Sequence, residues 1–244
     1  MDVPDRIIIS GVSGGLGSAL AEQLPSDKVF GISRQINPDK NYKQFICDIS
    51  DYDLTEELLR DLRFSREQKV AIVLTAGTLG RSGGIIDSDI TDWEKIMRVN
   101  LFGNLAIIRA FLPNILYSGY GRIVFVAGGG AAYAYPKFSG YALSKVAIVR
   151  EVENIAEEMK DKVDNFSIIA LAPGAMETKM LKMVKFLGGE VKTTVDINEP
   201  VKFIKDFILM DSEKAKKLSG KFVHVRDDLT SEDFKNKWKL RRIE

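Results

Sequence analysis

The sequence predicts an α/β protein built on a doubly wound parallel sheet of about seven strands, with helices on both faces. Short aliphatic and β-branched runs alternate along the chain with longer segments of helical periodicity, and this order is typical of a parallel sheet. The first such run, residues 6–10, leads directly into a glycine-rich turn and then into a helical segment. Ligands of such sheets bind beyond the carboxyl ends of the strands, so we look for a site there.

The expected strands are short runs rich in Val, Ile, Phe and Leu, the composition of strands buried on both faces. They cover residues 6–10, 28–34, 44–47, 70–74, 121–126, 166–171 and 221–225. Helical patterns lie between them, over residues 18–24, 53–63, 91–116, 139–160 and 200–210. Pro25 ends the first helix, and Thr91 has N-cap character for the third. Residues 176–195 are less regular, and no repeat or linker divides residues 1–244, so we expect a single domain.

Composition excludes several classes of partner. The 244 residues are 45% hydrophobic and 28% charged, as in soluble globular proteins, and a net charge of +1 offers no field for nucleic acid or membrane. No apolar run approaches the roughly 20 residues of a spanning helix, and the start lacks a signal-peptide pattern. The only cysteine, Cys47, suits the reducing cytoplasm. Neither Cys47 nor His224 has a partner motif, so we expect a cytoplasmic protein without a metal site.

The glycine turn suggests a dinucleotide. Residues 11–17 read Gly-Val-Ser-Gly-Gly-Leu-Gly, and glycines let the backbone approach a pyrophosphate while the following helix supplies free N–H groups. The spacing differs from the common G-x-G-x-x-G fingerprint, and such turns also serve as plain connectors. The second strand ends in Ser33-Arg34 without a carboxylate. Because arginine accommodates a 2′-phosphate, we favour NADP(H) over NAD(H) in an NAD(P)-binding Rossmann domain, a solvated arginine being the alternative.

Tyr141 and Lys145 form the candidate acid/base pair. They are four residues apart in a helical pattern and therefore share a face. A phenol has a pKa of about 10, and a nearby ammonium lowers it, so the pair suits proton transfer near neutral pH. A surface Tyr and Lys at this spacing by chance is the alternative.

These residues resemble the short-chain dehydrogenase/reductase (SDR) family, and the resemblance spans nearly the whole chain. Gly11, Gly15 and Gly17 resemble its glycine motif. Tyr141 and Lys145 resemble its catalytic pair. Asp48 resembles its adenine-contacting aspartate, and Thr75-Ala76-Gly77 resembles its Asn-Ala-Gly segment. Asn100 resembles its helix asparagine. Pro173-Gly174 and Thr178 resemble its loop near the nicotinamide.

The resemblance implies hydride transfer between a nicotinamide and a carbonyl or alcohol carbon, with Tyr141 as acid/base. Lys145 would hold the nicotinamide ribose and lower the Tyr141 pKa, and Asn100 would support a water that relays protons to Lys145. The implied cofactor-binding residues are Gly11, Ser13, Gly15, Leu16, Gly17, Ser33, Arg34, Asp48, Ile49, Ala76, Gly77, Tyr141, Lys145, Pro173, Gly174 and Thr178. Residues 176–197 would form a substrate lid and residues 226–244 a C-terminal tail. The helices at 91–116 and 139–160 would pair across a two-fold axis in a homodimer or homotetramer.

One departure from the family matters. The family has a serine thirteen residues before the tyrosine, and here that position is Gly128. We expect a divergent subset with Gly-Gly-Gly-Ala at this point, associated loosely with surface-sugar pathways, and hence a sugar-like substrate. Gly128, Gly129 and Ser139 are the candidate substrate residues. A hydroxyl of Ser139, Tyr133 or Tyr135, or backbone N–H groups of the glycines, could replace the serine. There are two alternatives. One is an enzyme that uses bound cofactor without net turnover, as epimerases do, and the other is a non-catalytic cofactor-binding or scaffold protein.

Overall fold

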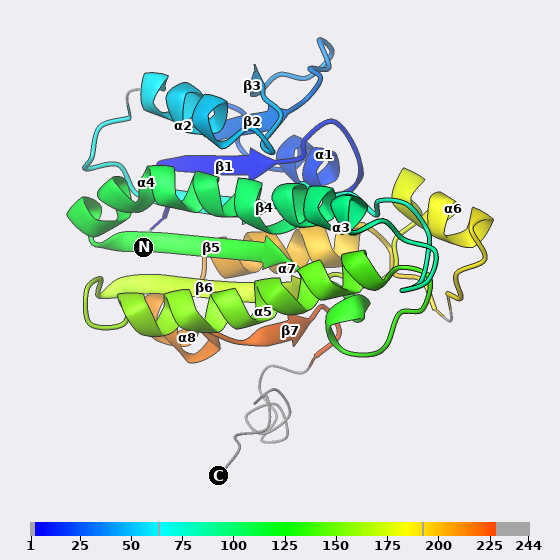
Figure 1. Cartoon of the computed structure of the whole chain (residues 1–244). Coiled ribbons are helices and arrows are strands. Elements are labelled where there is room, and N and C mark those ends of the chain that lie inside the picture. Colours follow the sequence, from blue (N-terminus) through cyan, green and yellow to red (C-terminus); the bar gives the residue numbers. More distant parts are fainter. Residues whose placement is uncertain (1–2, 63, 192, 228–244) are drawn as a thin grey trace.

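The computed structural model describes residues 3–62, 64–191 and 193–227. Its centre is one seven-stranded sheet in the order β3-β2-β1-β4-β5-β6-β7, parallel throughout (Figure 1). The strands are β1 (Arg6–Ser10), β2 (Val29–Ser33), β3 (Lys43–Ile46), β4 (Val70–Leu74), β5 (Tyr120–Val126), β6 (Asn165–Ala172) and β7 (Phe222–His224). The strand order reverses between β1 and β4, the switch point where such sheets bind ligands. The predicted fold class is thereby confirmed.

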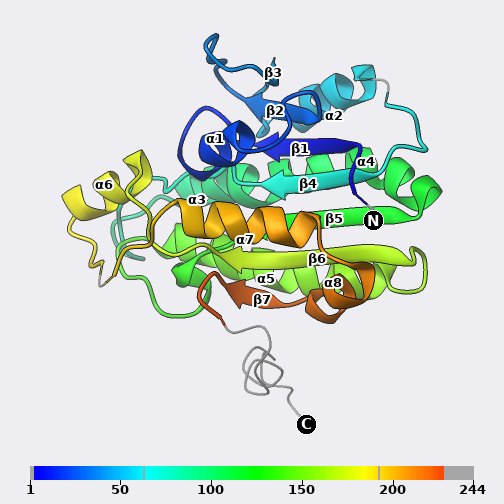
Figure 2. The same ribbon diagram turned by 180° about the vertical axis from the view of Figure 1, so that it is seen from behind.

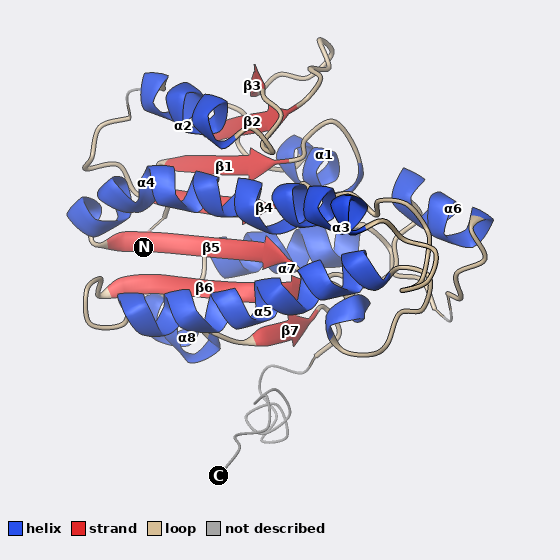
Figure 3. Cartoon of the chain, viewed as in Figure 1, coloured by secondary structure: helices blue, strands red, loops and turns tan. Residues whose placement is uncertain are grey.

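Helices cover both faces of the sheet. One face carries α2 (Tyr52–Asp61), α3 (Ile90–Met97), α4 (Asn104–Ser118) and α5 (Ser139–Met159), and Figure 2 shows α1 (Gly15–Glu22), α7 (Asn198–Ile208) and α8 (Ser212–Leu218) on the other. The last helix, α6 (Lys179–Phe186), lies beyond the carboxyl edge of the sheet, near the loops that follow β4 and β5 (Figure 3).

The period of two in the strands separates the core into two layers. In β1, Ile8 belongs to the cluster under α4 and α5, whereas Ile7 and Ile9 belong to the cluster under α1 and α7. All three side chains are at most 2% exposed. This double burial explains why β1 reads as a continuous apolar run.

Two helices are absent from the sequence prediction. Residues 176–195, expected to be irregular, contain α6, which begins where the Thr178 hydroxyl accepts the Leu181 N–H at 3.3 Å. The other is α8, whose N-cap Asp211 accepts the Glu213 N–H at 3.0 Å. Both are short, with seven or eight residues, and short amphipathic segments depend on tertiary packing for stability. The expected tail, residues 226–244, lies outside the described residues beyond position 227.

The third predicted helix runs from Ile90 to Ser118 but is not regular. A π-helical segment, η1 (Arg98–Gly103), interrupts it and contains Asn100. By length and composition this stretch could cross a membrane. However, 56% of its most apolar window is buried inside the protein, as in the core helix of a globular domain. We therefore attribute its apolar composition to packing against the sheet and α5.

Candidate functional site

The glycine turn after β1 is packed so closely that side chains would not fit. Gly11 has φ +84°, and a β-carbon there would lie 2.8 Å from the Ala76 nitrogen at the end of β4. A β-carbon on Gly17 would collide with the Gly11 carbonyl. No side chain caps the N-terminus of α1, and its first turn holds no acidic residue. Free N–H groups at the start of α1 therefore face a space that a phosphate could occupy.

Thr178, in the loop after β6, meets the turn beyond the carboxyl ends of the strands. Gly15 has φ +57°, and a β-carbon there would lie 3.6 Å from the Thr178 methyl group. The structure thus brings the glycine turn close to Thr178, which follows β6. In contrast, the Leu16 side chain is buried in the core, so only its backbone can face a ligand.

A hollow of about 290 Å³ lies at the end of β2, lined by Ser13, Arg34 and Gln35. Arg34 is exposed. Ser33, predicted to bind cofactor with Arg34, is only 6% exposed, and its hydroxyl donates to the Gln35 carbonyl. Its side chain shapes the turn and does not line the hollow.

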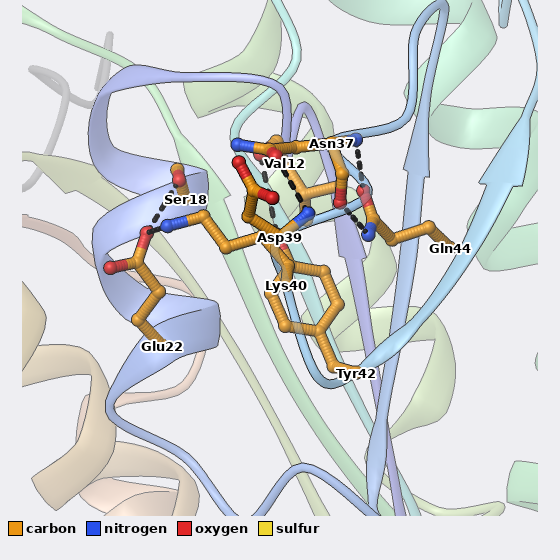
Figure 4. Close-up of polar contacts among 8 residues, drawn as sticks. All are labelled: Val12, Ser18, Glu22, Asn37, Asp39, Lys40, Tyr42 and Gln44. Carbon is orange, nitrogen blue, oxygen red and sulfur yellow. Dashed lines mark hydrogen bonds and ion pairs between the residues drawn. The ribbon is translucent and has the colours of Figure 1, made fainter.

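The loop between β2 and β3 is fixed against α1, as Figure 4 shows. Lys40 forms an ion pair with Glu22 at 2.6 Å, and the Ser18 hydroxyl donates to the same carboxylate at 2.8 Å. Both hydrogen bonds lower the pKa of Glu22, and the bond from Lys40 has the larger effect. Farther along the loop, the Tyr42 hydroxyl donates to the Val12 carbonyl at 3.5 Å. These contacts hold the loop that carries Arg34 against the glycine turn.

Asp48 and Ile49 follow β3 at the same edge. The Asp48 carboxylate is exposed and accepts the backbone N–H and the hydroxyl of Ser50 at 3.0 and 2.8 Å. Ile49 is buried, and its carbonyl lies so close to Gly103 that a β-carbon on Gly103 would collide with it. This contact sets the distance between η1 and the end of β3.

The Tyr141–Lys145 pair meets Asn100 and Gly77 beyond the ends of β4 and β5. The Lys145 ammonium lies 5.4 Å from the centre of the Tyr141 ring and donates to the Val126 carbonyl at 2.8 Å. A β-carbon on Gly77 would lie 3.3 Å from Asn100 Oδ1 and 3.8 Å from Lys145 Nζ. Gly77 therefore leaves open a space beside both polar groups.

Burial shifts the pKa of both members of the pair. It lowers the pKa of Lys145 from 10.5 to about 8. It raises the pKa of Tyr141 above its ordinary value, and the phenols of Tyr135 and Tyr133 raise it further. The predicted decrease of the Tyr141 pKa is therefore wrong for the protein without cofactor. The desolvation of the phenolate outweighs the attraction of an ammonium that is itself poorly solvated.

Asn100 is fully buried and saturated with hydrogen bonds. Its Oδ1 accepts the Thr78 N–H at 2.7 Å, while its Nδ2 donates to the Thr78 carbonyl and to the Ser144 hydroxyl, each at 2.9 Å. The Ser144 hydroxyl in turn donates to the Tyr141 carbonyl at 2.7 Å. These bonds fix the segment after β4 against the helix of Tyr141.

The sequence analysis missed Asn104, four residues after Asn100. Its Oδ1 accepts the Ser10 hydroxyl at 2.7 Å, and its Nδ2 donates to the Ala76 carbonyl at 3.0 Å and to the Asn100 carbonyl at 3.2 Å. Asn104 therefore ties the ends of β1 and β4 to η1. The spacing of four between two asparagines in an apolar helix was the available signal.

The substrate candidates lie at the end of β5. Gly128 has φ +145°, and a β-carbon there would lie 3.5 Å from the Tyr141 hydroxyl. Gly129 starts the 3₁₀ turn η2 (Gly129–Ala131), and a β-carbon on it would collide with the Tyr133 hydroxyl. Ser139 is the first residue of α5, two positions from Tyr141 and hence on another side of the helix.

Apolar side chains surround the Tyr141 ring. Leu79, Phe138 and Val184 form a buried cluster, and the partly buried side chains packed against it are Tyr135, Tyr141, Met180, Leu187 and Val191. The cluster joins α6 to the loop after β4. Gly83 of that loop forms an isolated parallel β-bridge with Phe138, just before α5. The segment predicted to form a lid therefore contacts the apolar side chains beside Tyr141.

The last predicted residues follow β6. Pro173 is buried. Gly174 has φ +78°, and a β-carbon on it would collide with the Val195 side chain. Val195 donates its N–H to the Ala175 carbonyl at 2.8 Å, which closes the segment containing α6 back onto β6. Over residues 3–62, 64–191 and 193–227, no group of His, Cys, Asp and Glu could hold a metal ion.

Comparison with known proteins agrees with this geometry. The sequence profile described as "short chain dehydrogenase" matches residues 5–185. A benzil reductase, (S)-benzoin forming, of Saccharomyces cerevisiae is 29% identical over 226 residues, covering 84% of each chain. An NADPH-dependent pterin aldehyde reductase of Arabidopsis thaliana is 27% identical over 191 residues, covering 72% of this chain and 76% of the relative.

The solved structure of ElxO with NADP bound has the same fold, with a TM-score of 0.76 at 20% identity over 91% of this chain and 97% of that one. Because the sequence profile covers most of the chain, the protein belongs to the short-chain dehydrogenase family. It is accordingly an enzyme of the oxidoreductase class, in a family that binds NAD(P) and acts on small molecules.

Proposed function

We propose that the protein reduces the carbonyl group of a small molecule with NADPH, and that Tyr141 donates the proton. The observation that carries this proposal is the position of the Tyr141 hydroxyl, which faces the side-chain-free Gly128 at the carboxyl edge of the sheet. A substrate oxygen can approach the hydroxyl there. A phenol has an ordinary pKa of about 10, so Tyr141 holds its proton at neutral pH and can donate it in a reduction.

The residues at both ends of the site fit a dinucleotide phosphate. The glycines of residues 11–17 and the uncapped start of α1 would hold the pyrophosphate, with Thr178 opposite. Ser13 and Arg34 would bind the 2′-phosphate in the hollow at the end of β2. The assignment also agrees with the NADPH-dependent relative and the NADP-bound structure. The cofactor supplies the hydride and its electron pair.

The remaining assigned residues place the nicotinamide and the adenine. Lys145 and Asn100 border the open space beside Gly77, where Lys145 would donate to the nicotinamide ribose. The segment of Pro173 and Gly174 would support the nicotinamide from the β6 side, while Ala76 contributes backbone. Asp48 and Ile49, at the end of β3, would border the adenine. Each role is the one that the family resemblance implies for that residue, and all of these residues lie at the carboxyl edge of the sheet.

The side chains around Tyr141 favour an apolar or aromatic carbonyl compound over a sugar. The cluster that contacts the Tyr141 and Tyr135 rings consists of Leu, Phe, Val and Met side chains, which offer no hydrogen bonds to sugar hydroxyls. Benzil, the substrate in the name of the yeast relative, is a diketone with two phenyl rings. The sugar-like substrate suggested by sequence is therefore the less well supported choice.

Gly128 in the place of the family's serine favours a second candidate, a protein that binds cofactor without turnover. The two functions differ in one experiment. The purified protein is incubated with NADPH and a panel containing aromatic ketones, aldehydes and aldoses, and loss of the reduced nicotinamide absorbance is followed. Tyr141→Phe should reduce turnover by about 10²-fold or more while the dissociation constant of NADPH stays near that of the wild type. Binding of NADPH with no turnover of any compound would support the scaffold instead.

The proposal extends to assembly and compartment. The exposed apolar side chains of α4 and α5 and of the segment η1 between α3 and α4 include Phe102, Leu116, Leu143 and Val146, and pairing of these helices in a homodimer or homotetramer would cover them. Sedimentation at several concentrations tests this. A cytoplasmic location suits the buried free thiol of Cys47.

A further inference from the structure

Gly128 leaves the Tyr141 hydroxyl uncovered, and the chain cannot easily restore a side chain there. A β-carbon at position 128 would be in ordinary contact with that hydroxyl, at 3.5 Å. The obstacle is the backbone, because φ +145° is an angle that residues other than glycine rarely adopt. If a second hydroxyl polarises the substrate oxygen, it therefore comes from another residue.

Tyr133 places its hydroxyl over the next glycine. The Tyr133 N–H donates to the Gly129 carbonyl at 3.2 Å, which closes a helical turn. Side chains in such turns point back toward the N-terminus, and the Tyr133 hydroxyl consequently lies against the α-carbon of Gly129, where a β-carbon would collide with it. Gly129 is not in the left-handed region. Its missing side chain therefore serves to admit the hydroxyl, not to permit an unusual backbone angle.

The Tyr133 hydroxyl is also available to a ligand. The residue is 66% exposed, and within the described part of the chain its hydroxyl has no protein hydrogen-bond partner. The Tyr133 phenol is near enough to Tyr141 to affect its titration. The Tyr141 hydroxyl at Gly128 and the Tyr133 hydroxyl at Gly129 therefore border adjacent residues of the glycine run that follows β5.

We infer that the Tyr133 hydroxyl donates a hydrogen bond to the substrate oxygen while Tyr141 protonates it; this inference rests on the proposed reductase function. In the reduction, the carbonyl carbon accepts a hydride with its electron pair from reduced nicotinamide, and the C=O π pair moves to oxygen. Oxygen then takes the proton of Tyr141, and the resulting phenolate regains a proton from solvent. Tyr133 keeps its own proton throughout. A fixed donor of this kind stabilises the negative charge that develops on oxygen.

Tyr135, the other tyrosine considered for this role, is the comparison residue. Its ring lies 5.2 Å from the Phe138 ring and 6.3 Å from the Tyr141 ring, measured between centres, and packs against the apolar cluster. Burial raises its pKa, as expected of a phenol within an apolar wall. Its contacts are those of the ring, which phenylalanine would preserve.

The test compares steady-state kinetics of Tyr133→Phe, Tyr135→Phe and the wild type with NADPH and one carbonyl substrate. Tyr133→Phe should lower kcat about 10²-fold, the usual effect of losing one such donor, with an unchanged dissociation constant for NADPH. Tyr135→Phe should lower kcat much less than Tyr133→Phe, because it keeps the ring contacts and removes only a hydroxyl within the apolar wall. Gly129→Ala, which displaces the Tyr133 hydroxyl, should reproduce the loss, and the double variant Gly129→Ala/Tyr133→Phe should be no worse than either single variant.

A wild-type kcat in Tyr133→Phe would overturn the inference and leave the proposed function intact. Equal losses in Tyr133→Phe and Tyr135→Phe would also overturn it, since the effect would then belong to the aromatic wall. Additive losses in the double variant would overturn the part of the inference that has Gly129 admit the Tyr133 hydroxyl, because the two residues would then act independently. A wild type that reduces no carbonyl compound would refute both the proposed function and this inference.

Discussion

Replacing Lys145 by Met should stabilise the cofactor-free protein at neutral pH, although it removes a group that the proposed function requires. Burial lowers the pKa of Lys145 from 10.5 to about 8. At 1.36 kcal/mol per pH unit, the folded protein therefore disfavours the ammonium by roughly 3 kcal/mol. The variant also loses the hydrogen bond to the Val126 carbonyl, worth about 1 kcal/mol. The net gain should be about 2 kcal/mol at pH 7.

The gain should depend on pH in a defined direction. Between pH 8 and 10.5 the unfolded chain holds a proton on Lys145 that the folded protein has lost, so wild-type stability rises with pH across this window. The Met variant lacks that rise, and its advantage should shrink by up to roughly 3 kcal/mol between pH 7 and 10.5. Between pH 7 and 9, Tyr141 keeps its proton in both the folded and the unfolded chain, because its ordinary pKa is about 10 and burial raises it. The change over this part of the window therefore belongs to Lys145.

Urea denaturation of both proteins at half-unit pH intervals measures the difference in the free energy of unfolding. Lys214→Met, at an exposed position of α8, controls for removing a positive charge. A Met variant less stable than the wild type at pH 7 would refute the reasoning. A difference that stays constant from pH 7 to 10.5 would also refute it, because the ammonium would then not be the destabilising group.

Two further predictions concern the cofactor. Arg34→Ala should raise the dissociation constant of NADPH about 10–100-fold, the equivalent of one charge-assisted hydrogen bond, and leave that of NADH nearly unchanged. Fluorescence titration measures both constants. Equal losses of affinity for NADPH and NADH would contradict a role of Arg34 in binding the 2′-phosphate. Gly17→Ala should lower NADPH affinity and the midpoint of thermal unfolding, because its β-carbon would collide with the Gly11 carbonyl. A β-carbon on Gly14 would face open space, so Gly14→Ala should leave the midpoint of thermal unfolding unchanged in calorimetry without NADPH. A similar loss of stability in both variants would rule out the close approach at Gly17.

Sequence patterns were sufficient for the sheet because its strands obey one simple rule. Strands buried on both faces are apolar throughout, and β1, β4 and β6 can be recognised from composition alone. The glycine turn and the Tyr141–Lys145 spacing are equally local features. Their meeting point at the carboxyl edge follows from the parallel topology. The fold class is therefore confirmed, while the roles of individual site residues stay predictions.

The remaining features depend on contacts between distant segments. α6 packs through Val184 onto Phe138 and Leu79, a neighbourhood that no local pattern announces. The raised pKa of Tyr141 arises from burial in the folded chain, whereas the spacing to Lys145 suggested the opposite direction. Likewise, the Ser33 hydroxyl turns to the Gln35 carbonyl, which only the conformation of the loop determines.

The π-helical segment η1 sets how the two halves of its helix face their partners. Before it, Trp93 and Ile96 contact α5 so closely that a β-carbon on Gly140 would lie 3.0 Å from each. After it, Asn104 reaches the ends of β1 and β4. A π turn holds an extra residue, and one residue of a regular helix corresponds to about 100° of rotation. A regular helix with the same number of residues would turn one half about 100° away from its partners. The wider π turn therefore lets Trp93 and Ile96 face α5 while Asn104 still faces the ends of β1 and β4.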